Sequence, residues 1–213
     1  MNMAELRYTL LGDGSSDRRL LPVITWVLQQ HTTVPIAPSW ANFGFLRERP
    51  CTLRDRAIAA LEYYAAPPLL IHRDAEAETR EQRIAEIAQA VRGLGIPDYV
   101  CVIPVRMQEA WLLFDESAIR QAAGNPNGRQ PLSLPSLHRV ELVPNPKEVL
   151  FQALRDASEL GARRLAAFNP AQAAHRVAEL IDDYSPLRQL AAFATLEGDL
   201  RAAIARLMTA PMR

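Results

Sequence analysis

Short apolar runs alternate with amphipathic stretches through the first half of the chain, and this alternation limits the possible folds more than any other sequence feature. The apolar runs occupy residues 6–11, 69–72 and 99–104, and the segments between them carry apolar side chains at helical spacing. Such short runs, bounded by turn signals, are typical of strands that are covered on both faces. We therefore expect an α/β fold in which helices flank a mostly parallel sheet.

A further strand candidate, residues 34–40, contains two prolines. Pro35 and Pro38 have no backbone N–H to donate to a neighbouring strand, so the pattern favours a strand at the edge of the sheet. After the first strand and a glycine-rich turn, either Ser16 or Asp17 can cap the next helix.

The second half of the chain is more helical. Residues 107–114 and 116–123 predict two short helices or one bent helix, and residues 125–144 predict a long, turn-rich surface loop. Three later helix starts combine a capping residue with a proline, at Asn145-Pro146, Asn169-Pro170 and Ser185-Pro186. We expect an α/β domain over residues 1–124, with residues 125–213 forming a loop and a helical part packed on the same domain.

Charge and composition exclude several classes of protein. The chain has 24 basic and 24 acidic residues, and its net charge of zero excludes a strongly basic nucleic-acid coat but not a local basic patch. No apolar run reaches the roughly 20 residues of a membrane-spanning helix, and residues 1–7 show no secretory pattern. Cys51 and Cys101 have neither disulfide-framework nor zinc-site spacing. We therefore expect a cytoplasmic protein with no membrane partner.

Carboxylates follow two of the predicted strands. Asp13 comes after the first strand, and Asp74 and Glu76 come after the strand at 69–72. Parallel strands present their carboxyl ends, and therefore these side chains, at one edge of the sheet. Converging carboxylates repel one another unless a cation lies between them, and all-oxygen ligands suit Mg²⁺ or Mn²⁺. The pattern predicts a metal site, with a turn aspartate and an acidic first helical turn as the alternatives.

The same segments resemble a known family of domains. Residues 11–17, Leu-Gly-Asp-Gly-Ser-Ser-Asp, resemble the Glu-Gly-x-Ser/Thr-Asp signature of Toprim domains, with Asp13 in the place of the glutamate. Asp74-Ala75-Glu76 resembles their Asp-x-Asp motif, with Glu76 in the place of the second aspartate. Both departures keep a carboxylate and change its reach by one methylene.

A second resemblance is more specific. Residues 106–115 resemble the Glu-x-Trp-Leu-x-x-Asp stretch of the DUF4276 family of Toprim-like bacterial proteins, and they contain Glu109 and Trp111. Weaker landmarks of the family match Pro146-Lys147-Glu148 and Ser185-Pro186-Leu187-Arg188. The resemblance implies a Toprim-type sheet, metal-dependent phosphodiester chemistry and a link to phage or mobile-element defence, often beside an ATPase. It also implies that Glu109 lies at the acidic site, as a ligand or as a partner of a ligand.

Several residues near the predicted site can contact a phosphate. They are Ser15, Ser16, Arg18, Arg73 and Lys147, the only lysine of the chain. Ordinary surface ion pairs and an exposed lysine in a first helical turn are the alternatives. No tyrosine is placed for a topoisomerase-type covalent step, because Tyr8 lies inside the first strand.

The resulting expectation is a Mg²⁺-dependent, or Mn²⁺-dependent, nuclease. Asp13, Asp74 and Glu76 hold the metal, and Glu109 assists the catalytic step. The main alternative is a non-catalytic subunit that binds nucleic acid or nucleotide beside an ATPase partner, and the third is a small-molecule phosphohydrolase. The sequence leaves the substrate, the partner and the oligomeric state open.

Overall fold

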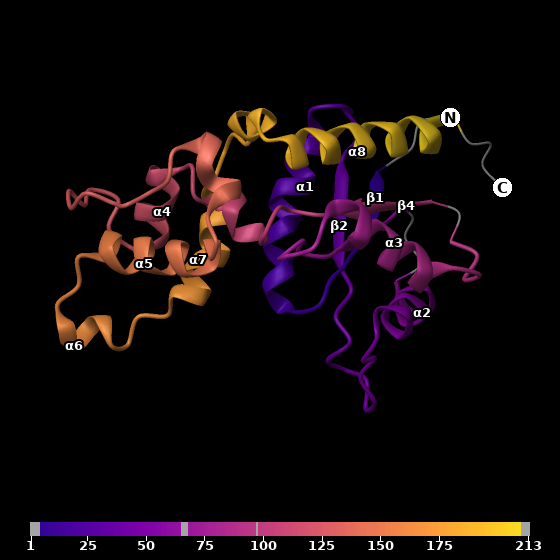
Figure 1. Ribbon diagram of the computed structural model, residues 1–213, viewed down its shortest axis with the longest axis horizontal. Helices are drawn as coiled ribbons and strands as arrows, with labels where there is room; N and C mark the ends of the chain where they lie inside the picture. Colours follow the sequence, from indigo (N-terminus) through magenta and orange to yellow (C-terminus); the bar gives the residue numbers. More distant parts are fainter. Residues whose placement is uncertain (1–4, 65–67, 97, 210–213) are drawn as a thin grey trace.

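The computed structural model describes residues 5–64, 68–96 and 98–209, and within them it contains a sheet of four parallel strands (Figure 1). The spatial order is β2-β1-β3-β4, and each neighbouring pair is parallel. The strands are β1 (Leu6–Leu11), β2 (Ile36–Trp40), β3 (Leu69–His72) and β4 (Tyr99–Val102). The predicted α/β class, with a parallel sheet flanked by helices, is confirmed.

Strand β2 lies at the edge of the sheet, as its prolines predict. Its register pairs Pro38 with Tyr8 and Trp40 with Leu10 of β1. An edge strand has a neighbour on one side only, so a residue without an N–H costs it less than it costs a central strand. The edge position brings Trp40 to the carboxyl end of the sheet, beside the end of β1.

Helices cover both faces of the sheet because successive strand residues are apolar on both sides. Leu10 and Leu70 belong to the larger core cluster, and Leu11 and Ile71 belong to the smaller one. The larger cluster includes residues of α1 (Leu20–Gln29) and α8 (Ala191–Thr209), and the smaller one includes residues of α2 (Leu53–Tyr63) and α3 (Arg80–Val91). The sheet is therefore the middle layer between the two sets of helices.

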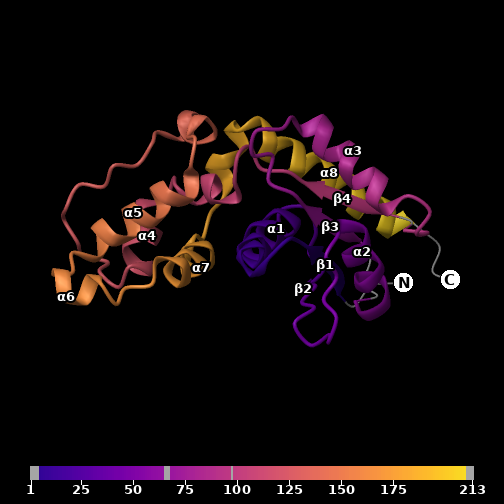
Figure 2. The ribbon, with the colours of Figure 1, turned by 60° about the horizontal axis from the view of Figure 1, so that its bottom comes forward.

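A helical lobe lies beside the sheet and is joined to it by the larger core cluster (Figures 1 and 2). Trp111 is fully buried there, and its ring meets Phe193 of α8 edge to face at 5.5 Å between centroids. The lobe contains η2 (Gln108–Leu112), α4 (Glu116–Ala122), η3 (Leu137–Leu142), α5 (Pro146–Ser158), α6 (Ala162–Leu165), α7 (Pro170–Leu180) and η4 (Ser185–Gln189). Helix α8 then returns along the sheet.

Two of the three predicted helix starts of the lobe agree with the structure. The third does not, because Ser185 lies inside the 3₁₀ helix η4, whose cap position is held by Tyr184 without a side-chain cap hydrogen bond. Asn145 Oδ1 accepts from Glu148 N at 3.2 Å, and Asn169 Oδ1 accepts from Gln172 N at 3.1 Å, so both asparagines cap helices whose first residue is proline. Residues 107–123 form two short helices, with Asp115 as the cap of the second. Within the described residues, no helix combines the length and the apolar character that a membrane span needs.

The segment after β1 differs from the prediction. A 3₁₀ helix, η1 (Ser15–Arg19), begins after Gly14, and α1 starts only at Leu20. The expected cap of α1 by Ser16 or Asp17 is therefore wrong. Asp17 lies inside η1 and turns back toward the glycine-rich turn, which makes it part of the candidate site.

Candidate functional site

The carboxyl ends of β1 and β3 meet at one edge of the sheet, where Leu11 pairs with Ile71. Asp13 and Asp74 each follow their strand by two residues, so the chain carries both to the same place. A hollow of about 300 Å³ opens there. It is lined by Asp13, Gly14, Ser16, Asp17, His72, Arg73, Asp74, Glu76 and Arg83. The three predicted metal ligands, Asp13, Asp74 and Glu76, thus line a single hollow.

A buried histidine at the end of β3 lies between two aspartates. His72 Nδ1 faces Asp17 Oδ2 at 3.1 Å, and Nε2 faces Asp74 Oδ1 at 3.1 Å. Burial alone lowers the pKa of His72, but the contacts and charges of Asp17 and Asp74 outweigh it and raise that pKa to about 9. The site therefore contains a resident cation, the His72 imidazolium, at neutral pH.

The buried Asp17 carboxylate lies at the floor of the hollow and accepts hydrogen bonds there. Its Oδ2 accepts from Asp13 N at 2.6 Å and from Gly14 N at 3.3 Å, and its Oδ1 accepts from Gln108 Nε2 at 2.9 Å. Burial alone raises the pKa of Asp17, but His72 and these backbone N–H groups lower it to about 2. A Cβ at position 12 would collide with this carboxylate, which explains the glycine there.

Gln108 links this floor to Asp74. Its backbone N donates to Asp74 Oδ1 at 2.8 Å, while its side chain donates to Asp17. Asp74 Oδ1 thus receives two donors, one from His72 and one from Gln108. These contacts fix the orientation of the Asp74 carboxylate before any ligand arrives.

Asp13 is the most exposed of the aspartates in the hollow, with 45% of its side chain accessible, and two arginines bind it. Arg56 of α2 contacts its Oδ1, and Arg73 contacts its Oδ2. Arg73 also pairs with Glu86 at 2.9 Å. The Asp13 charge is therefore balanced by protein cations, and these arginines would have to turn away before Asp13 could bind a metal.

Glu76 lies on a left-handed backbone segment. The backbone angle φ is +54° at Glu76 and +63° at Arg106. Two hydrogen bonds join these residues: Glu76 N donates to Arg106 O at 2.9 Å, and Arg106 Nη1 donates to Glu76 O at 3.1 Å. Non-glycine residues in this conformation cost about 1 kcal/mol or more and are concentrated at functional sites. The Glu76 carboxylate is exposed and pairs with Arg83 at 3.3 Å.

Glu109 and Lys147 do not line the hollow. Arg19 Nη1 and Glu109 Oε1 form an ion pair of 2.6 Å whose side chains are 3% and 4% exposed. Burial raises the pKa of Glu109, and the Arg19 charge opposes that rise. Lys147 is exposed, and its Nζ lies 5.8 Å from the Phe151 ring centroid. Glu109 thus lies behind the site as the partner of Arg19.

The predicted phosphate contacts divide between two places. Ser16 and Arg73 line the hollow, whereas Ser15 and Arg18 line a second pocket on the other side of η1. Sequence reasoning missed Asp17, His72 and Gln108 as members of the site. A usable signal existed for His72, because a histidine that ends a fully apolar strand enters a parallel sheet at its ligand-binding edge.

The donor set decides which kind of metal site fits. Among the described residues, no group of three or more His, Cys, Asp or Glu side chains is arranged to hold a metal ion. Asp74 and Glu76 supply carboxylates on one hollow, and Mg²⁺ binds through one or two carboxylates when waters and substrate phosphates complete its shell. The residues fit a cation that is shared with a phosphate ligand, rather than a preformed cage.

Comparisons with protein-family models, with curated proteins and with solved structures find no significant match to this chain. The Toprim and DUF4276 resemblances therefore stay predictions from short motifs.

Proposed function

We propose that this chain is a Mg²⁺-dependent, Toprim-type enzyme that cleaves phosphodiester bonds of nucleic acid at the hollow between β1 and β3. One observation supports this proposal above the others. Asp13, Asp74 and Glu76, which come from two separate strand ends, line the same hollow together with Arg73 and Arg83. Carboxylates for a divalent cation and guanidinium groups for phosphate oxygens are the two parts that phosphodiester cleavage requires.

The residues of the hollow have distinct tasks in this proposal. Asp74 and Glu76 would hold the cation, which when bound lowers the pKa of a water and stabilises charge on the phosphate. His72 and Gln108 hold Asp74 in place through its Oδ1. Arg73 binds the phosphate and so leaves Asp13 Oδ2, and Asp13 completes the site once Arg56 has also turned away from its Oδ1.

Exchanging Asp74 for asparagine tests the proposal. We expect wild-type protein with Mg²⁺ or Mn²⁺ to cleave DNA or RNA, and EDTA to stop the reaction. Asp74→Asn keeps the size of the side chain and removes the charge that holds the cation, so cleavage should fall at least about 100-fold, equivalent to about 3 kcal/mol of barrier. The measurement is the initial rate of cleavage of labelled single strands and duplexes.

Asp199→Asn is the matched control for this experiment. Asp199 is a half-buried aspartate paired with Arg80 at 2.9 Å, and it lies outside the hollow. The initial cleavage rate of the Asp199→Asn variant should stay within about twofold of the wild-type rate. Cleavage that survives Asp74→Asn, with circular dichroism spectra unchanged, would remove Asp74 from the mechanism.

A second candidate function is a binding subunit that partners an ATPase without cutting nucleic acid. The pairing of Asp13 with both Arg56 and Arg73 favours it, because the carboxylate in the place of the Toprim glutamate is neutralised. Calorimetry separates the two candidates. A measurable heat of Mn²⁺ binding at millimolar Mn²⁺ supports the enzyme. If no heat of Mn²⁺ binding is measured and the protein binds nucleic acid in EDTA, the result supports the binding subunit. The third candidate, a small-molecule phosphohydrolase, is tested by comparing the products formed from free nucleotides with those formed from nucleic-acid polymers.

The cellular setting belongs to the same proposal. We propose a cytoplasmic protein. A role in phage or mobile-element defence and an ATPase partner are what the motif resemblance implies. Co-purification of the full chain from its native host, with and without Asp74→Asn, would identify such a partner.

A further inference from the structure

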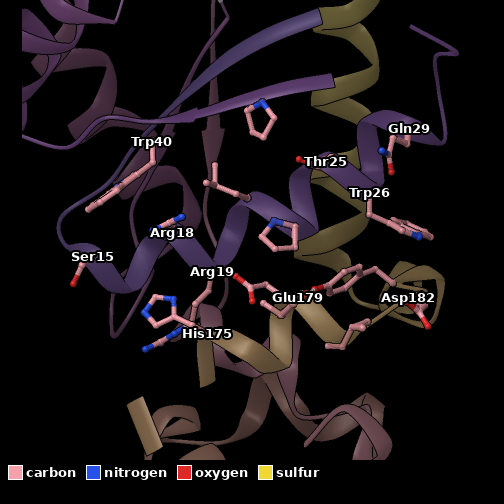
Figure 3. A pocket seen from close by; sticks show the side chains of 16 residues that line it. Ser15, Arg18, Arg19, Thr25, Trp26, Gln29, Trp40, His175, Glu179 and Asp182 are labelled. Atoms are coloured by element: carbon pink, nitrogen blue, oxygen red, sulfur yellow. Dashed lines mark hydrogen bonds between the residues drawn. The ribbon is translucent and has the colours of Figure 1, made fainter. Parts of the chain in front are cut away.

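A second pocket, larger than the hollow, lies on the other side of η1 (Figure 3). Its volume is about 600 Å³, which is within the usual range of sites for small ligands and cofactors. Residues of η1, α1, β2 and α7 line it. Ser16 and Asp17 of η1 face the hollow, while Ser15 and Arg18 face this pocket. The short η1 helix is therefore a wall shared by both cavities.

The two ends of this pocket differ in charge. Figure 3 places Ser15, Arg18, His175 and Trp40 toward one end, and Trp26 and Asp182 toward the other. Arg18 forms no ion pair with another described residue. A pocket end with an exposed, unpaired guanidinium is suited to an anion.

The environment of His175 agrees with a concentration of positive charge at that end. Burial lowers the pKa of His175, and the charges of Arg19 and Arg18 lower it further. Arg19 is compensated by Glu109, so Arg18 supplies the uncompensated charge. Glu179 lies between the two ends, and its charge raises the pKa of His175 in opposition to the arginines. Asp182 lies at the opposite end and repels an anion there, so an anionic group is favoured at the end that holds Arg18.

Two tryptophans, Trp26 and Trp40, line the pocket, and they differ in their contacts with other side chains. Trp26 meets Tyr184 edge to face at 6.0 Å, and the Arg188 guanidinium lies 5.2 Å from its centroid. Trp40, half-buried at the end of β2, takes part in no aromatic or cation–π contact between described residues. A tryptophan without an aromatic or cationic neighbour among the described residues, near an arginine without an ion pair there, is suited to bind the base and the phosphate of a single strand.

We propose that this pocket binds one nucleotide, with its base on Trp40 and its phosphate on Arg18, Ser15 and His175. The inference rests on the proposed function: the nucleotide is the neighbour of the phosphodiester that enters the hollow across η1. A base inside a duplex is stacked on its neighbours and cannot reach Trp40, so the substrate class is single-stranded nucleic acid.

Binding measured in EDTA tests the inference without cleavage. The probes are a fluorescein-labelled single-stranded DNA of about ten nucleotides, the same sequence as RNA, and the matching duplex, followed by fluorescence anisotropy. We expect wild-type protein to bind a single strand about tenfold more tightly than the duplex. Trp40→Ala should weaken single-strand binding by about tenfold, since each stacked base contributes a factor of this order.

Arg18→Gln provides a second variant on an exposed residue. We expect it to weaken binding about fivefold and to reduce the slope of log affinity against log salt by about one, because one phosphate contact is lost. The matched controls are Tyr63→Ala, an exposed aromatic residue of α2, and Arg163→Gln, an exposed arginine of α6, and neither should change binding.

The outcomes separate this inference from the proposed function. Trp40-dependent binding of single strands without any Mg²⁺-dependent cleavage supports the pocket and contradicts the enzyme. Binding of adenosine monophosphate with the same Trp40 dependence supports the pocket and identifies a free nucleotide as its ligand. Cleavage and single-strand binding that are both unchanged in Trp40→Ala and Arg18→Gln overturn the pocket and leave the enzyme standing. No detectable binding of DNA, RNA or adenosine monophosphate by wild-type protein also overturns the pocket.

Discussion

Replacing Glu109 with leucine is expected to lower the free energy of unfolding by about 3–5 kcal/mol. The Arg19 guanidinium is buried and has Glu109 as its charged partner at 2.6 Å. Leucine fills the space but leaves the guanidinium as an uncompensated charge away from water. The measurement is chemical denaturation followed by circular dichroism at pH 7.

Two controls isolate the burial of this pair. Glu148 pairs with Arg155 at 3.7 Å while 66% of its side chain is exposed, so Glu148→Leu should change the free energy of unfolding by less than about 1 kcal/mol. The double variant Arg19→Met/Glu109→Leu should recover much of the loss, because it removes both charges. Equal effects of Glu109→Leu and Glu148→Leu would contradict a structural role for the buried pair.

Replacing Asp17 with alanine is expected to lower the free energy of unfolding by about 3 kcal/mol or more. The change leaves the His72 imidazolium without one of its two carboxylates. It also removes the acceptor of the Asp13 and Gly14 N–H groups and of the Gln108 side chain. Denaturation at pH 6 in EDTA measures this effect free of any bound cation.

The same network sets the pH dependence of stability. The folded pKa of His72, about 9, lies above its unfolded value of 6.5, so its contribution is complete below pH 6.5 and is lost as pH rises toward 9. The folded pKa of Asp17, about 2, lies below its unfolded value of 3.8, so its contribution is lost as pH falls from 3.8 to 2. Stability should therefore be highest between about pH 4 and 6.5 and fall by about 3 kcal/mol toward pH 9.

Asp183→Ala is the matched control for Asp17→Ala. Asp183 also accepts a backbone N–H and a hydroxyl, both from Ser185, but it is exposed, so its loss should lower the free energy of unfolding by about 1 kcal/mol or less.

Asp17→Ala should also flatten the decline of the free energy of unfolding between pH 6.5 and 9, since His72 keeps only Asp74 as a partner. A decline as steep as in wild type would show that Asp17 does not set the His72 pKa.

The sheet and the placement of Asp13 and Asp74 at one of its edges were predictable from the sequence because they depend on local patterns. Apolar runs predicted the strands, and the prolines at 35 and 38 predicted the edge position of β2. The placement of Asp13 and Asp74 at one edge follows from parallel pairing alone, since strands that run the same way end together.

The partners of the acidic residues were not predictable in the same way. Arg56 comes from α2 and Arg83 from α3, so their contacts with Asp13 and Glu76 depend on how two helices pack over the sheet. Asp17 matched the pattern of a helix cap, but the intervening η1 helix turned its side chain back into the hollow. Glu109 could not be told from a solvated residue, because its burial depends on Arg19, far away in the sequence.

Anomalous X-ray scattering from crystals of the full chain soaked in Mn²⁺ and a short, non-cleavable phosphorothioate single strand would test the shared cation most directly. The account predicts a manganese peak in the hollow, about 2 Å from oxygens of Asp74 and Glu76 and bridged to a phosphate, with Arg73 turned from Asp13 to that phosphate. Crystals that hold the strand at full occupancy but show no manganese at Asp74, with Asp13 still bound by Arg56 and Arg73, would contradict it.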